Sequence, residues 1–123
     1  MAKQVRKRFL YLMRRPPHGS IHAQEGLETV LIGAAFEQRV SLLFLDDGVF
    51  LLKRGQSPSG VGLKDFARGF RALPDYEVEH FYVEDRSLAS RGLAPADLIM
   101  EVEPVSPERA AEIIDAHDVV LSF

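Results

Sequence analysis

The sequence predicts an α/β fold: a single-domain, three-layer sandwich with a mainly parallel sheet of about five strands flanked by helices. Two observations predict it. Apolar runs of strand length alternate with segments of helical periodicity, and these runs are continuously apolar, as expected of parallel strands covered on both faces. The intervals between the runs are long enough for right-handed helical crossovers. The length of 123 residues, with 46% hydrophobic and 27% charged residues, suits one globular domain spanning 1–123.

The first half of the chain supplies two predicted strands, a long helix and a short helical turn. Residues 8–13 are aromatic and apolar and precede a Pro-Pro-His-Gly turn, which favours a buried strand. Apolar residues at helical spacing predict a helix over 21–38, with Ser20 at its N-cap position. The apolar run 40–45 predicts the second strand, and a helical turn is expected over 49–53.

The middle of the chain begins with a loop and continues with a helix and a strand. Glycine, proline and serine dominate residues 54–62, which predicts a flexible loop. Phenylalanines and leucines at helical spacing predict a helix over 63–73. Residues 77–83 predict a third strand, followed by a short helix near 86–91 that ends at Gly92.

The last part of the chain predicts two more strands around a well-marked helix. The apolar run 98–102 predicts a fourth strand. Ser106, Pro107 and Glu108 form a strong helix start: a capping serine, a proline at the first helical position and an acid in the first turn. This helix is expected to run to about residue 117, and residues 119–123 predict a final strand.

Charge and hydropathy exclude two kinds of partner. With 15 basic and 18 acidic residues the chain carries −3, so direct nucleic-acid binding is not expected. No apolar run approaches the ~18 residues of a membrane-spanning helix, so no membrane partner is expected. The charges are sorted, however, because residues 1–15 hold six bases and no acid, whereas 74–123 hold twelve acids and three bases. This polarity favours docking on a partner of complementary charge, the alternative being two solvated faces.

The start of the chain has a basic segment before an apolar one, the order found in secretory signals. Residues 1–8 are basic and residues 9–13 are apolar. This apolar stretch is shorter than the ~7–15 residues of a secretory core, and Arg14-Arg15 ends it at once. We therefore expect a first strand here and a cytoplasmic protein.

No cofactor or metal is expected. Cysteine is absent, which excludes disulfides, thiolate metal sites and a sulfur-carrying nucleophile on this chain. The glycine-rich residues 55–62 lack the Lys-Ser/Thr of a phosphate loop and the third glycine of a dinucleotide turn. His18 and His22 are four residues apart, but no third ligand is close in sequence.

Asp46 and Asp47 follow the predicted second strand directly. Ligands and catalytic groups of open α/β sheets gather at the carboxyl ends of strands, and neighbouring carboxylates are suited to acid/base work. The structural alternative is a strand-to-helix turn, in which an aspartate caps the short helix and Gly48 permits the turn. Capping is the interpretation we favour.

An ordered set of segments resembles the DsrE/DsrF-like sulfur-relay family, and within it the TusC/DsrF subunit. The resemblance covers nearly the whole chain from Phe9. The segments are Arg15-Pro16-Pro17-His18-Gly19-Ser20, Gln24-Glu25-Gly26-Leu27-Glu28, Leu43-Phe44-Leu45-Asp46-Asp47-Gly48-Val49-Phe50, Arg54-Gly55-Gln56, Asp75-Tyr76-Glu77-Val78, Ser87-Leu88, Arg91-Gly92-Leu93 and Asp118-Val119-Val120-Leu121-Ser122-Phe123. Residues 61–66 look more like the branch that acts in sulfur oxidation.

The resemblance implies a subunit of a heterohexamer with TusB/DsrH-like and TusD/DsrE-like sisters. Such a complex passes persulfide sulfur to a downstream carrier, either for 2-thiouridine in tRNA or in dissimilatory sulfur oxidation. In the family the sulfur-carrying cysteine belongs chiefly to the TusD/DsrE sister. Because a chain without cysteine cannot carry persulfide sulfur, we expect a non-catalytic subunit, not an enzyme.

The candidate partner-interface residues lie in the two loops that follow the first and second strands. Parallel strands bring these loops to one edge of the sheet. The candidates are Arg15, His18, Asp46, Asp47, Gly48 and Phe50. The alternative functions are a stand-alone small α/β enzyme using Asp46, Asp47 and His18, and a flavodoxin-like binder of a nucleotide or flavin at the strand-end loops.

Overall fold

The computed structural model describes residues 7–16, 26, 28–30, 39–53 and 78–123. These residues build a five-stranded sheet in the order β4-β3-β2-β1-β5, and all four strand pairings are parallel. The strands are β1 (Arg8–Met13), β2 (Arg39–Phe44), β3 (His80–Glu84), β4 (Glu103–Val105) and β5 (Val119–Ser122). The predicted fold class is therefore confirmed.

The central strands are apolar along their length because both faces of the sheet are covered. Alternate residues of β1 enter different clusters of buried side chains: Leu10 and Leu12 on one face, Tyr11 and Met13 on the other. Burial raises the pKa of the Tyr11 hydroxyl above its usual range. This pattern explains why the strand is continuously apolar rather than alternating.

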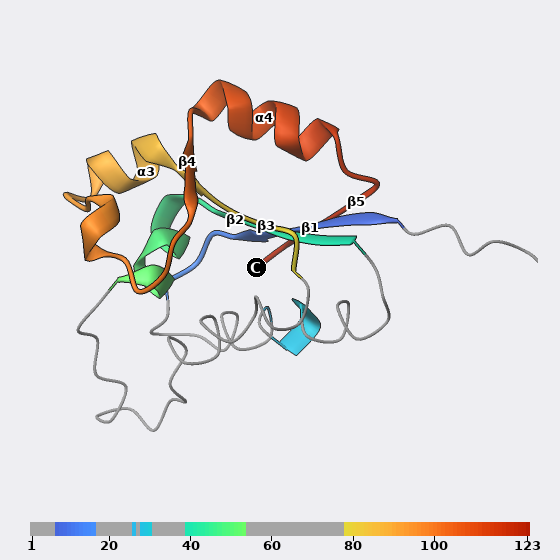
Figure 1. Cartoon of the computed structure of the whole chain (residues 1–123), viewed down its shortest axis with the longest axis horizontal. Helices are drawn as coiled ribbons and strands as arrows, with labels where there is room; N and C mark the ends of the chain where they lie inside the picture. Colours follow the sequence, from blue (N-terminus) through green and yellow to red (C-terminus); the bar gives the residue numbers. More distant parts are fainter. Residues whose placement is uncertain (1–6, 17–25, 27, 31–38, 54–77) are drawn as a thin grey trace, which may run out of the picture.

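Helices cover the two faces. On one face α4 (Pro107–Asp115) packs Ala110 and Ile113 against the sheet. Gly26 and residues 28–30 are helical and lie on the opposite side of the sheet in Figure 1. A Cβ built on Gly26 would lie 3.1 Å from the side chains of Met13 and Phe123, so this helical segment packs closely on β1 and the chain end.

The start of α4 confirms its prediction. The Ser106 hydroxyl accepts a hydrogen bond from the Arg109 N–H at 3.1 Å, and Pro107 occupies the first helical position. The helix ends at Asp115, two residues earlier than predicted. The Nδ1 atom of His117 then lies 2.6 Å from the Ile113 carbonyl oxygen.

The predicted fourth strand over 98–102 is wrong. The strand is β4, Glu103–Val105, and the apolar run before it is irregular. Leu98 forms an isolated antiparallel bridge with Lys53, and the Ile99 N–H donates to the Leu52 carbonyl at 2.7 Å. The first two residues of the run therefore pair with the end of η1 and with Lys53, outside the parallel sheet. Because β4 is an edge strand, it tolerates Pro104.

The short elements at the strand ends differ from the prediction by a few residues. The helical turn expected over 49–53 is the 3-10 helix η1 (Asp46–Leu52), which begins earlier. The strand expected over 77–83 begins at His80. The short helix near 86–91 is α3 (Asp85–Ser90), and Gly92 follows it with a φ of 68°, as predicted for a helix-ending glycine.

The remaining elements complete the comparison. A short 3-10 helix, η4 (Pro95–Asp97), connects α3 to the segment before β4. The final strand, predicted over 119–123, is β5. The loop predicted over 54–62, the helix over 63–73 and most of the helix over 21–38 lie outside the described residues. Within the described part of the chain, no helix has the length and hydropathy needed to span a membrane.

Candidate functional site

Polar side chains from three neighbouring strands meet at the carboxyl edge of the sheet. Arg14 follows β1, Asp46 and Asp47 follow β2, and Glu84 ends β3. Since β1, β2 and β3 are parallel neighbours, their carboxyl ends meet at the same edge. This edge contains the candidate site.

The turn after β2 is held in an unusual conformation. Asp46 has a φ of 52°, in the left-handed region that aspartate tolerates better than most residues. Its N–H donates to the Ser87 hydroxyl at 2.9 Å, and that hydroxyl donates to Glu84 Oε1 at 2.6 Å. Ser87 is only 3% exposed. The start of η1 is therefore fixed by a buried hydroxyl on α3.

Two ion pairs hold the aspartate side chains apart. Asp46 Oδ2 lies 3.0 Å from Arg14 Nη2, and Asp47 Oδ1 lies 3.0 Å from Arg91 Nε. Both pairs are partly exposed, so each stabilises the fold by only about 0–1 kcal/mol. Their main effect is geometric, because adjacent carboxylates are directed to different arginines.

The predicted capping role of Asp47 is wrong. The N-cap of η1 is Leu45, with no side-chain capping bond, and both aspartates lie in the first turn. Each aspartate carboxylate is instead paired with an arginine, whereas a capping carboxylate would accept a hydrogen bond from a backbone N–H. A sequence of Asp-Asp-Gly after a strand resembles a cap, but the competing arginines are not visible in that sequence.

Gly48 is needed because β1 approaches it closely. A Cβ at Gly48 would lie 1.7 Å from the carbonyl oxygen of Met13. In addition, the Leu45 N–H donates to that same oxygen at 3.1 Å. The end of β1 and the start of η1 are therefore in direct contact, and Arg14 after β1 lies beside Asp46 after β2.

The structure places the other candidate residues as follows. Arg15 is exposed at the bend after Arg14. Phe50 is half-buried on η1. His18 lies outside the described residues.

Sequence reasoning missed the residues that position this turn, namely Arg14, Glu84, Ser87 and Arg91. Arg14 and Glu84 are marked in the sequence only by their place at a strand end, and Ser87 and Arg91 only by the family resemblance. Ser87 and Arg91 lie 41 and 44 positions from their partners in the turn, so spacing alone does not connect them. Among the described residues, no group of three or more His, Cys, Asp or Glu side chains is placed to hold a metal ion.

The fold and this edge define a class of protein: a small parallel α/β sandwich with a polar strand-end turn and no cysteine. The comparisons with known proteins specify it further. The DsrE/DsrF-like family model matches residues 7–123, and the chain belongs to that family. The predicted resemblance is confirmed.

Curated relatives and solved structures agree with this membership. "Intracellular sulfur oxidation protein DsrF" of Allochromatium vinosum is 46% identical, covering 98% of each chain. "Protein TusC homolog" of Vibrio parahaemolyticus is 38% identical, over 92% of this chain and 96% of its own. The crystal structure of the ychN protein from E. coli matches 95% of this chain and 99% of its own, with a TM-score of 0.82 at 21% identity. The structural match supports the fold alone.

Proposed function

We propose that this chain is a non-catalytic subunit of a cytoplasmic sulfur-relay complex in which sister subunits carry the persulfide. The observation that carries the proposal is the complete absence of cysteine in a DsrE/DsrF-like chain. Persulfide transfer requires a thiolate that attacks and releases sulfane sulfur, and no oxygen side chain replaces it. The chain therefore acts through contact with other subunits.

The proposed partners are TusB/DsrH-like and TusD/DsrE-like sisters in a heterohexamer that delivers sulfur to a downstream carrier. Of the two pathways, dissimilatory sulfur oxidation has more support than tRNA thiolation. The relative named for sulfur oxidation is 46% identical, against 38% for a TusC homolog. No nucleic acid contacts this chain in the proposal.

The carboxyl edge of the sheet is the proposed contact with the sulfur-carrying sister. Its turn is preorganised by the Ser87 hydroxyl and by two arginines. Arg15 is exposed beside this turn, where its positive charge favours a thiolate or persulfide on the partner. Phe50, half-buried on the same 3-10 helix, supplies apolar contact area.

Intact-mass analysis of a reconstituted complex tests the proposal. The chain and both sisters are co-expressed, loaded with a persulfide donor, and weighed subunit by subunit. We expect a gain of about 32 Da, one sulfur atom, on a cysteine-bearing sister and none on this chain. A stable sulfur adduct on this chain, or a chain that stays monomeric beside both sisters, contradicts the proposal.

A further inference from the structure

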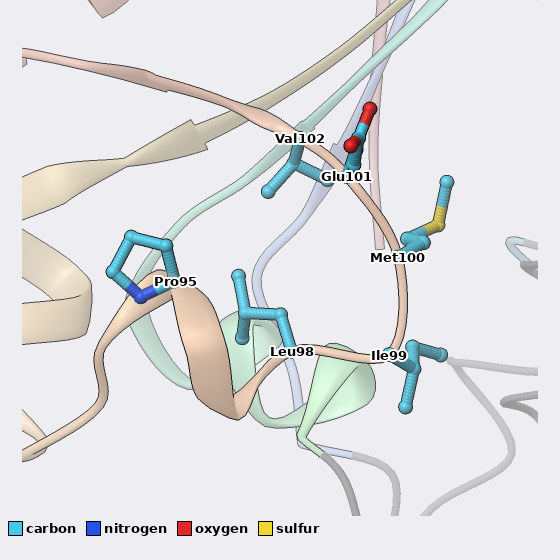
Figure 2. A pocket seen from close by; sticks show the side chains of 6 residues that line it. All are labelled: Pro95, Leu98, Ile99, Met100, Glu101 and Val102. Atoms are coloured by element: carbon cyan, nitrogen blue, oxygen red, sulfur yellow. The ribbon is translucent and has the colours of Figure 1, made fainter.

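The segment between η4 and β4 curves around an open groove at the surface. The groove has a volume of about 490 Å³ and is lined by Pro95, Leu98, Ile99, Met100, Glu101 and Val102. Figure 2 shows the side chains of Leu98 and Val102 directed into the space that this segment curves around, with Ile99 and Met100 on its outer side. The groove lies in the apolar run that was predicted to be a strand.

The lining combines apolar side chains with polar surface and is only partly buried. Leu98 is 2% exposed and belongs to the core, whereas Ile99, Met100 and Val102 pack against that core and remain half-exposed. Leu98 and Val102 are directed into the groove in Figure 2, so they supply its apolar contact area.

The rim of the groove is acidic. Glu101 lines the groove and is exposed, and Asp97 and Glu103 on either side of it are also exposed. Asp97 uses one carboxylate oxygen to accept the Ala94 N–H at 2.8 Å. Residues 95–102 include no basic side chain, and the exposed Lys53, which bridges to Leu98, is one base beside these three acids. A complementary partner segment carries an apolar side chain next to a lysine or arginine.

The groove is continuous with the proposed contact surface. Its segment is joined to η1 by the Lys53–Leu98 bridge and by the hydrogen bond from the Ile99 N–H to the Leu52 carbonyl. The other end of η1 carries Asp46 and Asp47. A stable interface covers about 800 Å² on each partner, which is more than one exposed turn provides. A subunit docked on η1 thus meets the groove as well.

We propose that this groove is the second half of the contact with the sulfur-carrying sister, and that it takes an apolar side chain from a basic segment of that subunit. The inference rests on the proposed function. Glu101 pairs with the lysine or arginine of that segment, and Val102 packs against its apolar side chain.

Binding measurements on four single variants test this inference. Glu101→Lys reverses the rim charge, and Val102→Gln makes the lining polar. Two matched controls make the same changes away from the groove: Glu108→Lys on exposed α4 and Val120→Gln on β5, where Val120 is 38% exposed. The affinity of each variant for the two sisters together is measured by calorimetry, and the melting temperature of each free chain is recorded.

We expect Glu101→Lys and Val102→Gln to weaken binding by about tenfold or more, and the controls by less than about threefold. Wild-type affinity in both groove variants overturns the groove proposal and leaves the proposed function intact. Equal weakening by Glu101→Lys and Glu108→Lys assigns the effect to net charge and also overturns the groove proposal. If Val102→Gln unfolds the free chain, Glu101→Lys decides alone. A wild-type chain that binds no sister overturns the proposed function itself.

Discussion

The hydroxyl of Ser87 connects the ends of two strands, β2 and β3, to α3 through two hydrogen bonds. It accepts from the Asp46 N–H and donates to Glu84, while its own residue lies on α3. Asp46 adopts a positive φ, which costs on the order of 1–2 kcal/mol for a residue with a side chain. A conformation of this kind persists only where its surroundings fix it. Ser87 is therefore a positioning residue for the turn.

We expect Ser87→Ala to destabilise the free chain by about 1–3 kcal/mol, because it leaves the Asp46 N–H and a Glu84 oxygen without a partner. Urea unfolding measures the loss. The matched control is Ser90→Ala on the same helix, whose hydroxyl donates to the Arg86 carbonyl at the surface. The control should cost less than about 1 kcal/mol. Equal losses in the two variants would show that the buried hydroxyl does not fix the turn.

At the scale of elements, the contact between η1 and β1 depends on one missing side chain. Gly48 lies against the Met13 carbonyl, with room for hydrogen only. Gly92 is the opposite case, since its φ is 68° but nothing lies within 4 Å of a built Cβ. The two glycines are needed for different reasons, one for space and one for conformation.

Alanine substitution separates these two reasons. Gly48→Ala must push η1 away from β1, so we expect a loss of at least about 3 kcal/mol. Gly92→Ala meets only the conformational cost of a positive φ, about 1 kcal/mol. Thermal unfolding of both variants checks the difference. A Gly48→Ala chain as stable as Gly92→Ala would mean that η1 is not seated against β1.

Some elements were predictable because local pattern fixes them. The strands β1 and β2 lie within a residue of their predicted bounds, since their apolar runs are bounded by turn residues. The run 98–102 failed because an apolar run specifies burial and not the surface that buries it. Here the backbone of Leu98 and Ile99 contacts Lys53 and Leu52, at the end of η1, and not the parallel sheet.

The candidate site was predictable only in part, for a related reason. The position of Asp46 and Asp47 at a strand end follows from the sequence and from the rule for parallel sheets. Their partners Arg14 and Arg91 depend on the order β3-β2-β1, which places distant segments side by side. Strand order is set by the folded chain as a whole, so the spacing of residues that are near in sequence does not predict it.

At the scale of the whole molecule, folding brings part of the basic start of the chain beside its acidic end. The Arg8 N–H donates to Asp118 Oδ2 at 2.8 Å, where β1 runs beside β5. The exposed acids of α4, Glu108 and Asp115, remain on the outer surface. The asymmetry in charge is thus kept in part after folding.

Assembly with sister subunits separates the roles proposed for Phe50 and Arg15. We expect Phe50→Ala to weaken assembly by about tenfold through lost apolar contact while the free chain stays folded. Arg15→Ala should leave assembly intact and slow sulfur transfer, because its charge favours the thiolate of the partner. Analytical ultracentrifugation and time-resolved mass analysis measure the two effects. If Phe50→Ala unfolds the free chain and Arg15→Ala changes neither property, these residues serve the fold and the solvent only.

The strand order also has a consequence for synthesis on the ribosome. β1 emerges early but lies between β2 and β5, and its pairing partner Val119 stands 110 positions after Phe9. At about 5–20 residues per second, translation leaves this side of β1 unpaired for roughly 5 to 20 seconds. An unpaired apolar strand is a template for aggregation during that time. Completion of the sheet therefore waits for the last strand, and the nascent chain depends on fast release or on chaperone cover until then.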